Sequence, residues 1–463
     1  MIRSLRFLPA LLTLVALTRC RGAEPTVPDS VILIGVDTLR ADRLGLYDSP
    51  LPYAPFIDRQ ARRGMVFTRA YATSPWTLPS FASIFTGRLP SGHGVRVVLD
   101  ETKERRAGSD PEVRGVFAKL RPTVPTLPEI LAASGVTTTA VAQNPILSPA
   151  FLLDRGFEVY DYEAGDNIDS RRADDVVDRA LEWIDLHRRH GKRFFLFLHF
   201  FDPHLNYDAP EPFRGTFTDG IESSLTVPIQ GAKSIRSRIR ELSTADEEFI
   251  EAAYNEEVRF VDHALGRFFD ALEARGLWDE SLVVLTSDHG EELFEHGGFE
   301  HGHDLFEELI RVPLIVWGPG VGTGEESTPV SIADIAPTIL DACGVEPPQQ
   351  IFGVSLWPSL TQGAKPVDRP LLAEATLYGA ERKALIQWPY KLIAVPELSL
   401  EWLFDLEADS LEAADLSEDR PDLVRSLRRR MELLSSAGGG AAQGDASLTP
   451  ELLEKLRALG YVH

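Results

Sequence analysis

The sequence predicts an α/β protein with a mainly parallel central sheet that is covered by helices on both faces. From Val31 onward, short apolar runs alternate with segments of helical pattern, which is the order of elements in βαβ units. Most of these runs lack the polar–apolar alternation of a one-sided sheet, as expected of strands buried on both faces. With 44% hydrophobic and 25% charged residues, the chain of 463 residues has the composition of a globular protein.

The apolar runs and helical patterns give the predicted elements in chain order. The expected strands of the central sheet are residues 31–37, 136–143, 194–200, 281–287 and 312–317. The expected helices are residues 54–64, 78–86, 126–134, 171–189, 244–275 and 332–343. Residues 211–241 show no clear period and are predicted to form an insertion loop or lid.

The chain is predicted to contain a main domain followed by a smaller unit. The predicted segments are an export signal at 1–23, the main domain at 28–345, a C-terminal α+β subdomain at 346–436, and a linker with a terminal helix at 437–463. In the subdomain, strands are expected at 383–387 and 390–395. The run AGGGAAQGDAS at 437–447 is typical of a flexible linker, and a last helix is expected at 449–459.

The N-terminal residues have the pattern of an export signal. Arg3 and Arg6 precede an apolar run at 7–17, which is shorter than the roughly 20 residues that a membrane-spanning helix needs. We therefore expect a protein that is periplasmic, extracellular or lipid-anchored at the cell surface. Cys20 is a candidate lipidation site, although Arg19 departs from the small-residue pattern of such sites. The alternative is a cleaved signal with an incidental cysteine.

Cysteine content and net charge exclude several kinds of site. Cys20 and Cys343 are the only cysteines, so neither a disulfide framework nor a multi-cysteine metal site can be built. With 47 basic against 70 acidic residues, the formal charge is −23, which disfavours nucleic acid as a partner. Any metal must therefore bind to oxygens and imidazoles.

Polar residues gather at the carboxyl ends of the predicted strands, where open α/β sheets bind their ligands. Asp37 ends the first strand, Asp202 and His204 follow the strand at 194–200, and Asp288 and His289 follow the strand at 281–287. Carboxylates with an imidazole suit one divalent ion such as Ca, Mn, Mg or Zn. Each residue taken alone also has a structural explanation, since Asp often caps a helix and Asp-His-Gly often forms a turn.

Thr77 stands at the start of a predicted short helix within the segment SPWTLPSFASIFTG. Pro79 suits the first turn of that helix, so Thr77 lies at or just before its N-cap. A hydroxyl at this position lies beside the positive end of the helix dipole, and a cation would activate it as a nucleophile. The structural alternative is that Thr77 only caps the helix.

Together, these motifs resemble the sulfatase family of the alkaline-phosphatase superfamily. The resemblance covers residues 31–343 and, more weakly, the C-terminus. The motifs that carry it are residues 36–42, 74–94, 198–207, 286–297 and 305–319, with 403–406 and 456–462 in the tail.

The resemblance implies a metal site and roles for further residues. Asp37, Asp288, His289 and the oxygen of Thr77 would hold the metal, and Thr77 takes the nucleophile position. His204 falls where the family places a histidine near the transferred group or the leaving oxygen. His303 falls close to a substrate-binding lysine of many sulfatases. Arg40 is a candidate for binding a non-bridging oxygen, with an ion pair to Asp42 or Glu291 as the alternative. A second metal site could recruit Asp202, His301 and His303, but the spacing does not require one, so we expect a single ion.

The sequence also departs from the sulfatase pattern. Sulfatases use a Cys or Ser that is oxidised to formylglycine, within a pattern of the form Cys/Ser-x-Pro-x-Arg. This chain has Thr77-Leu78-Pro79-Ser80-Phe81 instead, so both the oxidisable residue and the arginine are missing. Threonine cannot give this aldehyde because its β-carbon carries a methyl group. Relatives that use unmodified threonine, such as lipoteichoic-acid synthases and phosphoethanolamine transferases, act on phosphoesters.

The departure therefore favours hydrolysis or transfer of phosphate mono- or diesters through a Thr77-linked intermediate, with a small-molecule, glycan or lipid anionic ester as substrate. Three alternatives stay open at this point. They are a sulfuric ester hydrolase, a non-catalytic binding protein of the same fold, and a phosphoglycerate-mutase-type isomerase, which the export signal disfavours.

Overall fold

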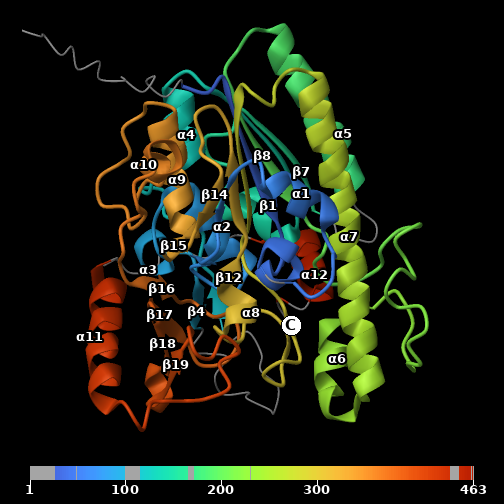
Figure 1. The fold of residues 1–463 in the computed structure, drawn as a ribbon, viewed down its shortest axis with the longest axis vertical. Coiled ribbons are helices and arrows are strands. Elements are labelled where there is room, and N and C mark those ends of the chain that lie inside the picture. Colours follow the sequence, from blue (N-terminus) through green and yellow to red (C-terminus); the bar gives the residue numbers. More distant parts are fainter. Residues whose placement is uncertain are drawn as a thin grey trace, which may run out of the picture.

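The structure is a computed structural model, and it describes residues 27–47, 49–99, 115–164, 171–229, 231–437, 448–459 and 461. An eight-stranded sheet forms its centre, in the spatial order β14-β2-β13-β9-β1-β8-β6-β7 (Figure 1). In that order, the strands are Gly324–Glu326, Met65–Phe67, Leu314–Trp317, Ser281–Ser287, Ser30–Val36, Phe194–Phe200, Thr137–Gln143 and Val159–Glu163. The predicted α/β fold with a mainly parallel sheet is confirmed.

The central strand β1 is parallel to both of its neighbours, β8 and β9. Its last residue, Val36, pairs with Phe200 of β8 and Ser287 of β9, so the three strands end at the same level. One expected strand behaves differently. Residues 314–317 form β13, which runs antiparallel to β9 and β2, whereas Val312 belongs to β12 (Arg311–Val312) in a separate small sheet. Proline at position 313 separates the two short strands, because it has no N–H for a ladder hydrogen bond.

Helices cover both faces of the central sheet (Figure 1). One face carries α1 (Pro55–Ala61), α5 (Ala173–Arg189) and α7 (Thr244–Ala274), and the other carries α2 (Thr77–Thr86), α4 (Leu127–Ala133) and α9 (Ile335–Ala342). Alternate residues of β1 enter the two hydrophobic cores, because successive side chains of a strand point to opposite faces. This explains the uninterrupted apolar run of its sequence.

The helices agree with the six predicted segments to within a few residues at each end, which is the usual uncertainty of helix boundaries. The predicted loop at 211–241 consists mainly of turns, with one short helix, α6 (Ala232–Ser237), that the sequence pattern did not reveal. The remaining short elements are β3 (Ala70–Tyr71), α3 (Pro90–His93), β4 (Val97–Leu99), β5 (Gly115–Phe117), β10 (Glu292–Leu293), β11 (Phe299–Glu300), α8 (Glu307–Ile310), β15 (Val330–Ser331) and α10 (Trp357–Gln362).

The C-terminal unit is a four-stranded antiparallel sheet with one long helix against it. Its strands are β16 (Leu371–Ala373), β17 (Lys383–Gln387), β18 (Tyr390–Val395) and β19 (Leu400–Asp405), and α11 (Pro421–Ala437) packs on them. The two predicted strands are confirmed as β17 and β18. The last helix, α12 (Pro450–Ala458), lies apart from α11 and contacts the 3-10 turn Pro145–Leu147 of the main unit. The predicted linker lies almost wholly outside the described residues.

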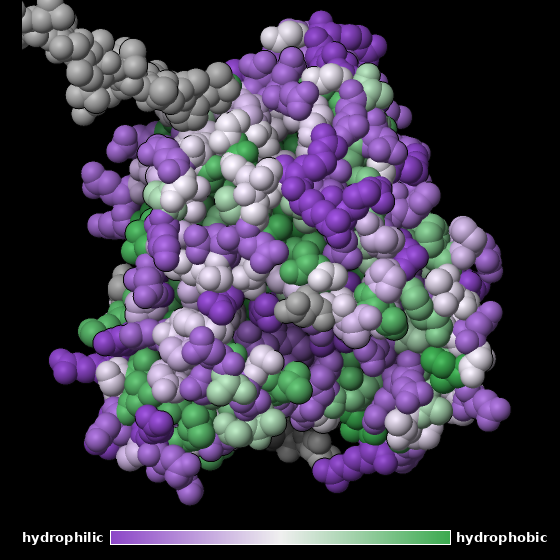
Figure 2. All heavy atoms as spheres, in the orientation of Figure 1, coloured by the Kyte–Doolittle hydropathy of each residue, from purple (hydrophilic) through white to green (hydrophobic). Residues whose placement is uncertain are grey.

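On the face shown in Figure 2, hydrophilic residues are mixed with scattered hydrophobic ones. Within the described ranges, no helix combines the length and the apolar character that crossing a bilayer requires. The predicted export signal and Cys20 lie outside the described residues. Cys343 is buried.

A buried lysine joins the C-terminal sheet to the main unit. Lys391 of β18 is fully buried, and its Nζ lies 3.1 Å from Glu307 Oε1 and 2.9 Å from Glu412 Oε1. We expect Lys391→Met to destabilise the fold by about 3–5 kcal/mol, because it leaves two carboxylates without their cation. Urea unfolding followed by circular dichroism measures the loss. Lys383→Met is the matched control, because this lysine is 20% exposed and its Nζ has only longer contacts, at 3.6 Å to Glu374 Oε2 and 3.3 Å to Ser435 Oγ. An equal loss in both variants would contradict the proposed importance of the buried pair.

Candidate active site

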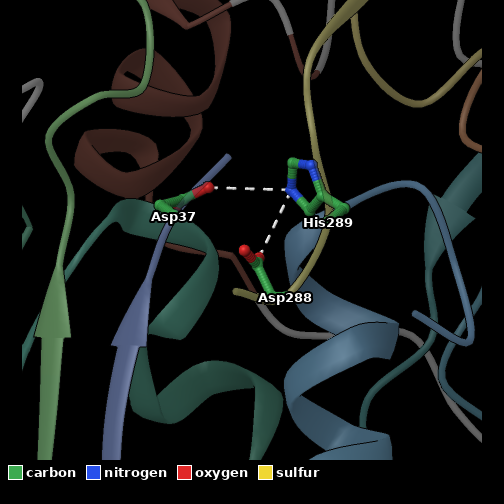
Figure 3. Close-up of side chains that lie close together, drawn as sticks. All are labelled: Asp37, Asp288 and His289. Carbon is green, nitrogen blue, oxygen red and sulfur yellow. Dashed lines mark ion pairs between the residues drawn. The ribbon is translucent and has the colours of Figure 1, made fainter. Parts of the chain in front are cut away.

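Three of the predicted metal ligands meet at the carboxyl ends of the central strands (Figure 3). Asp37 follows β1, and Asp288 and His289 follow β9, the strand next to it. His289 Nε2 lies 3.6 Å from Asp37 Oδ1 and 3.3 Å from Asp288 Oδ2. One ligand atom from each residue lies within 4.8 Å of the others, and all three side chains are fully buried. Parallel neighbouring strands thus bring residues from distant parts of the chain together.

The chemistry of this group fits a divalent cation. Within the described part of the chain, Asp37 Oδ1 and both carboxylate oxygens of Asp288 have no hydrogen-bond partner, although buried charges normally need one. Burial and then the negative charge of Asp37 raise the pKa of Asp288 well above its ordinary value. A cation between the two carboxylates would offset their repulsion. Oxygen ligands with one imidazole are suited to Ca, Mn, Mg or Zn.

His289 is oriented as a metal ligand would be. Its Nδ1 lies 2.8 Å from the carbonyl oxygen of Gly290, to which it can donate, so Nε2 faces the two carboxylates with its lone pair. Burial lowers the pKa of His289 to about 4, so the ring is neutral at pH 7. The predicted ligands Asp37, Asp288 and His289 therefore form one group that could bind a metal.

Thr77 opens towards this group from the first residue of α2. Its side chain is fully buried, and its Oγ1 lies 3.3 Å from His289 Nε2. The N-cap of α2 is Trp76, so Thr77 is the first residue of the helix, whereas the sequence predicted it at or just before the N-cap; it is therefore not the cap of the structural alternative either. The hydroxyl lies at the positive end of the helix dipole and next to the candidate metal ligands, which is where an anion would be stabilised.

A second set of residues surrounds Asp37. Asn144 Nδ2 donates to Asp37 Oδ2 over 2.8 Å, and His199 Nε2 lies 3.3 Å from the same oxygen. Burial by itself would raise the pKa of Asp37, but the hydrogen bond from His199 and the charges of nearby histidines lower it below its ordinary value. Asp37 is thus held as a carboxylate, the form that binds a cation.

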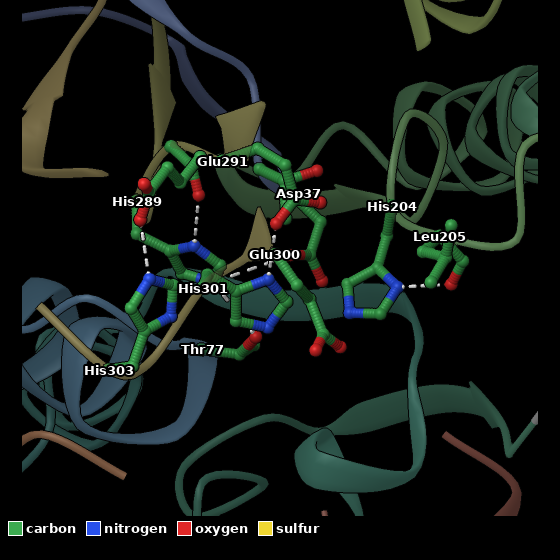
Figure 4. Close-up of polar contacts among 12 residues, drawn as sticks. Asp37, Thr77, His204, Leu205, His289, Glu291, Glu300, His301 and His303 are labelled. Atoms are coloured by element: carbon green, nitrogen blue, oxygen red, sulfur yellow. Dashed lines mark hydrogen bonds and ion pairs between the residues drawn. The ribbon is translucent and has the colours of Figure 1, made fainter. Parts of the chain in front are cut away.

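His204 lies at the edge of the cluster drawn in Figure 4, next to Leu205. Its Nδ1 lies 2.5 Å from the carbonyl oxygen of Leu205, and its Nε2 lies 3.1 Å from the hydroxyl of Tyr461. With its Nδ1 donating to a carbonyl, the ring presents Nε2 as the atom that can accept and return a proton. The ring centroid of His301 lies 5.0 Å from that of His204 and 4.4 Å from that of His289.

The remaining predicted residues have partners of their own. His303 Nε2 lies 2.5 Å from Glu292 Oε2, and His301 Nδ1 lies 2.8 Å from Glu291 Oε1. Arg40 is buried and forms ion pairs with Asp42 at 2.8 Å and Glu295 at 2.5 Å. Arg40 therefore forms the ion pair with Asp42 that was its alternative, and its second carboxylate is Glu295 instead of Glu291. Glu291 contacts Arg40 only through its backbone oxygen.

Asp202 lies away from the candidate metal ligands. Its carboxylate accepts hydrogen bonds from Arg172 Nε at 2.7 Å and from the backbone N–H of Ala173 at 2.8 Å, so it holds the start of α5. This arrangement assigns Asp202 a structural contact.

Sequence reasoning did not select Asn144, His199, Glu291 or Tyr461 as site residues. His199 is the next-to-last residue of the apolar strand β8, and a polar residue so near the carboxyl end of a strand was the available signal. For Tyr461, at the far end of the chain from Thr77, no local pattern indicates that it enters the site.

Comparison with known proteins identifies the family. The family model described as "Sulfatase" matches residues 29–345, and a second one, described as "N-sulphoglucosamine sulphohydrolase, C-terminal", matches residues 294–436. The chain belongs to the sulfatase family. It is an ester hydrolase of that family, within the alkaline-phosphatase superfamily.

Sulfatase relatives of known name match this sulfatase-family chain along most of its length. It is 27% identical to N-acetylgalactosamine-6-sulfatase of Rattus norvegicus over 74% of this chain and 68% of that protein. It is 26% identical to choline-sulfatase of Rhizobium meliloti (strain 1021) over 84% of this chain and 82% of that protein.

Solved structures share the fold of this sulfatase-family chain. One is a protein in complex with its substrate D-glucosamine-2-N,6-O-disulfate, at a TM-score of 0.68 and 21% identity, covering 89% of this chain and 98% of that chain. Another is the phosphonate monoester hydrolase of Agrobacterium radiobacter, at a TM-score of 0.69 and 19% identity, covering 89% and 96%. The shared fold is thus found with esters of different acids.

Proposed function

We propose that the chain hydrolyses or transfers anionic phosphate esters through a covalent intermediate on Thr77. The observation that carries the proposal is the position of the buried Thr77 Oγ1, 3.3 Å from His289 Nε2 in the group formed with Asp37 and Asp288. A nucleophile at the N-terminus of a helix and beside two carboxylates suits a reaction that needs a cation and an anionic substrate.

The proposed reaction has two displacements. The Thr77 hydroxyl loses its proton to solvent and its oxygen forms a bond to phosphorus, while the bond from phosphorus to the alcohol oxygen breaks and that oxygen takes the proton of His204 Nε2. Water or an acceptor alcohol then forms a bond to phosphorus and gives its proton to His204. The bond from phosphorus to the Thr77 oxygen breaks, that oxygen takes up a proton from solvent, and phosphate or a new phosphoester is released. A divalent ion, when bound by Asp37, Asp288 and His289, would lower the pKa of the nucleophile and offset charge on the non-bridging oxygens.

His204 is the proposed proton donor to the leaving oxygen. Its Nδ1 is directed to the Leu205 carbonyl oxygen, so Nε2 is the atom directed towards the Thr77 side of the site. A proton taken up at Nε2 can be passed to the alcohol oxygen as the ester bond breaks. His204→Gln should therefore slow esters of poorly leaving alcohols more than esters of nitrophenol.

The choice of phosphate rests on the chemistry of threonine. An unmodified hydroxyl can form a phospho-ester, whereas the aldehyde route of sulfatases needs a Cys or Ser and is closed to Thr77. Phe81 stands where the sulfatase pattern has its arginine, and it is fully buried in the hydrophobic core.

Hydrolysis of sulfate esters is the second candidate function, and the comparisons support it better than they support phosphate. The relatives named above are mostly sulfatases, and one structure with the same fold was solved with a sulfated glucosamine. A sulfated sugar or a small sulfate ester is therefore the substrate class of this candidate, with Thr77 as an unmodified nucleophile.

Turnover of matched aryl esters separates the two candidates. Aryl phosphate, aryl phosphodiester and aryl sulfate with the same leaving group are compared in the presence of Mn or Ca. We expect a higher kcat/KM for one of the phosphoesters. A higher value for the sulfate would overturn the phosphate proposal and favour the second candidate, while activity that persists in Thr77→Ala would overturn the role of Thr77 in both.

A further inference from the structure

The C-terminal tail enters the candidate active site. The tail described by the structure consists of α12, Leu459 and Tyr461, and Tyr461 is only 1% exposed. Its backbone N–H donates to the carbonyl oxygen of Leu456 over 2.9 Å, which folds the chain back after the helix. Tyr461 is therefore held in a defined position rather than at the end of a loose chain.

Apolar side chains anchor this tail to the main unit. Leu452, Leu456 and Leu459 are at most 7% exposed and belong to the hydrophobic core that contains α2 and α9. Lys455 Nζ also donates to the carbonyl oxygen of Ala164. The tail thus forms one side of the site. Burial of each leucine side chain stabilises this docked arrangement by about 1.5–3 kcal/mol.

The Tyr461 hydroxyl lies between the proposed nucleophile and the proposed proton donor. It is 3.1 Å from His204 Nε2, and it also forms a hydrogen bond with Thr77. The ring centroid of Tyr461 lies 6.3 Å from that of His301 (Figure 4 shows the neighbouring side chains). A tetrahedral anion joined to Thr77, with its leaving oxygen at His204, must lie beside this hydroxyl.

The phenol is a neutral hydrogen-bond donor in this position. A tyrosine hydroxyl has an ordinary pKa of about 10, so it carries its proton at neutral pH. A neutral O–H group in a site that excludes water stabilises an adjacent anionic oxygen without adding negative charge.

We propose that Tyr461 is a further catalytic residue. Its hydroxyl donates to His204 Nε2 in this structure. When Nε2 carries the proton for the leaving oxygen it can no longer accept, and the Tyr461 hydroxyl donates instead to a non-bridging oxygen of the anion held at Thr77. In this role the C-terminal tail completes the active site. The inference rests on the proposed function, because it uses Thr77 and His204 in the roles given above. It adds a substrate contact supplied by a segment outside the main domain.

Binding of orthovanadate to the Mn-loaded full chain tests this proposal without relying on turnover. Tyr461→Phe keeps the buried ring and removes only the hydroxyl. We expect it to weaken vanadate binding about 10- to 150-fold in isothermal titration calorimetry, as expected for one lost hydrogen bond to a charged group, and to lower kcat by a similar factor. The midpoint of thermal unfolding should change little. Tyr390→Phe is the control, because Tyr390 lies on β18 in the C-terminal sheet.

Two outcomes would overturn the role of Tyr461. Unchanged vanadate affinity in Tyr461→Phe would show that the hydroxyl does not contact the anion. Tighter binding, in Tyr461→Phe or in a chain that ends before Leu448, would show that the tail competes with the substrate instead of contacting it. Failure of the proposed function is distinguishable, because vanadate binding would then be insensitive to Thr77→Ala.

Discussion

Thr77→Ala is expected to lower kcat for the preferred ester by about 10⁴-fold or more, as the removal of other catalytic nucleophiles does. The variant lacks the oxygen that forms the covalent intermediate, and no other described hydroxyl occupies its position beside His289. Steady-state kinetics and mass spectrometry of the trapped phospho-enzyme measure the effect. Thr77→Ser keeps the oxygen and should retain far more activity than Thr77→Ala.

Thr86→Ala is the matched control for this experiment. Thr86 is a buried threonine of the same helix, and its Oγ1 donates to the carbonyl oxygen of Ala82 over 2.6 Å, away from the metal ligands. It should keep nearly full activity. Retention of more than about a tenth of the activity in Thr77→Ala would contradict the nucleophile assignment, since removing a covalent nucleophile costs far more than this.

Removal of the divalent ion is expected to abolish activity and to lower the unfolding temperature. An ion at 100 times its Kd stabilises the folded state by about 2.7 kcal/mol. Without it, nothing offsets the negative charge of Asp37 and Asp288 in a buried site, and burial together with the charge of Asp37 disfavours ionisation of Asp288. Chelation followed by differential scanning calorimetry and assay measures both effects, and added Mn or Ca should restore them.

Asp288→Asn tests whether this is the site that binds the ion. It should make the protein insensitive to chelator in calorimetry, because one ligand and one charge are lost. Glu308→Gln is the control, since Glu308 belongs to a second acidic and histidine group with Glu292 and His296, of which His296 is exposed. If Glu308→Gln instead removes the stabilisation by Mn, the ion binds at that second group.

His289 makes the stability of the folded protein depend on pH. Burial lowers its pKa to about 4 in the folded protein, compared with an ordinary value of 6.5. The unfolded chain therefore binds a proton at this residue in a pH range where the folded chain does not. The stability that the neutral ring contributes is complete above about pH 6.5 and is lost as the pH falls towards 4. Calorimetry between these values should show the loss, which Mn should shift to lower pH.

The sequence predicted the sheet and the residues that meet at its carboxyl edge, because both depend on short-range patterns. The run 31–37 shows at once a strand covered on both faces and an aspartate at its carboxyl end, and the structure brings that aspartate to Asp288 and His289 through strand pairing. The direction of β13 could not be predicted in this way. An apolar run of four residues looks the same in a parallel and an antiparallel strand.

Contacts between distant side chains were also beyond the sequence. The ion pair of Arg40 with Asp42, two residues away, was an expected alternative, but its second carboxylate, Glu295, comes from a distant segment that the sequence did not connect with it. Tyr461 lies at the end of a helix that packs on the turn Pro145–Leu147, and this docking depends on the whole tertiary structure. Such placements depend on the packing of distant segments, which local sequence periodicity does not predict.

The common level at which β1 and β9 end bears on laboratory evolution of this enzyme. Backbone hydrogen bonds between two interior strands set the spacing of Asp37 and Asp288, since Val36 pairs with Ser287. Randomised libraries confined to the segment at 211–241 would leave that spacing intact. Selection for new alcohol groups should therefore yield many folded, reactive clones from this segment, and few from libraries that alter residues on the two strands themselves.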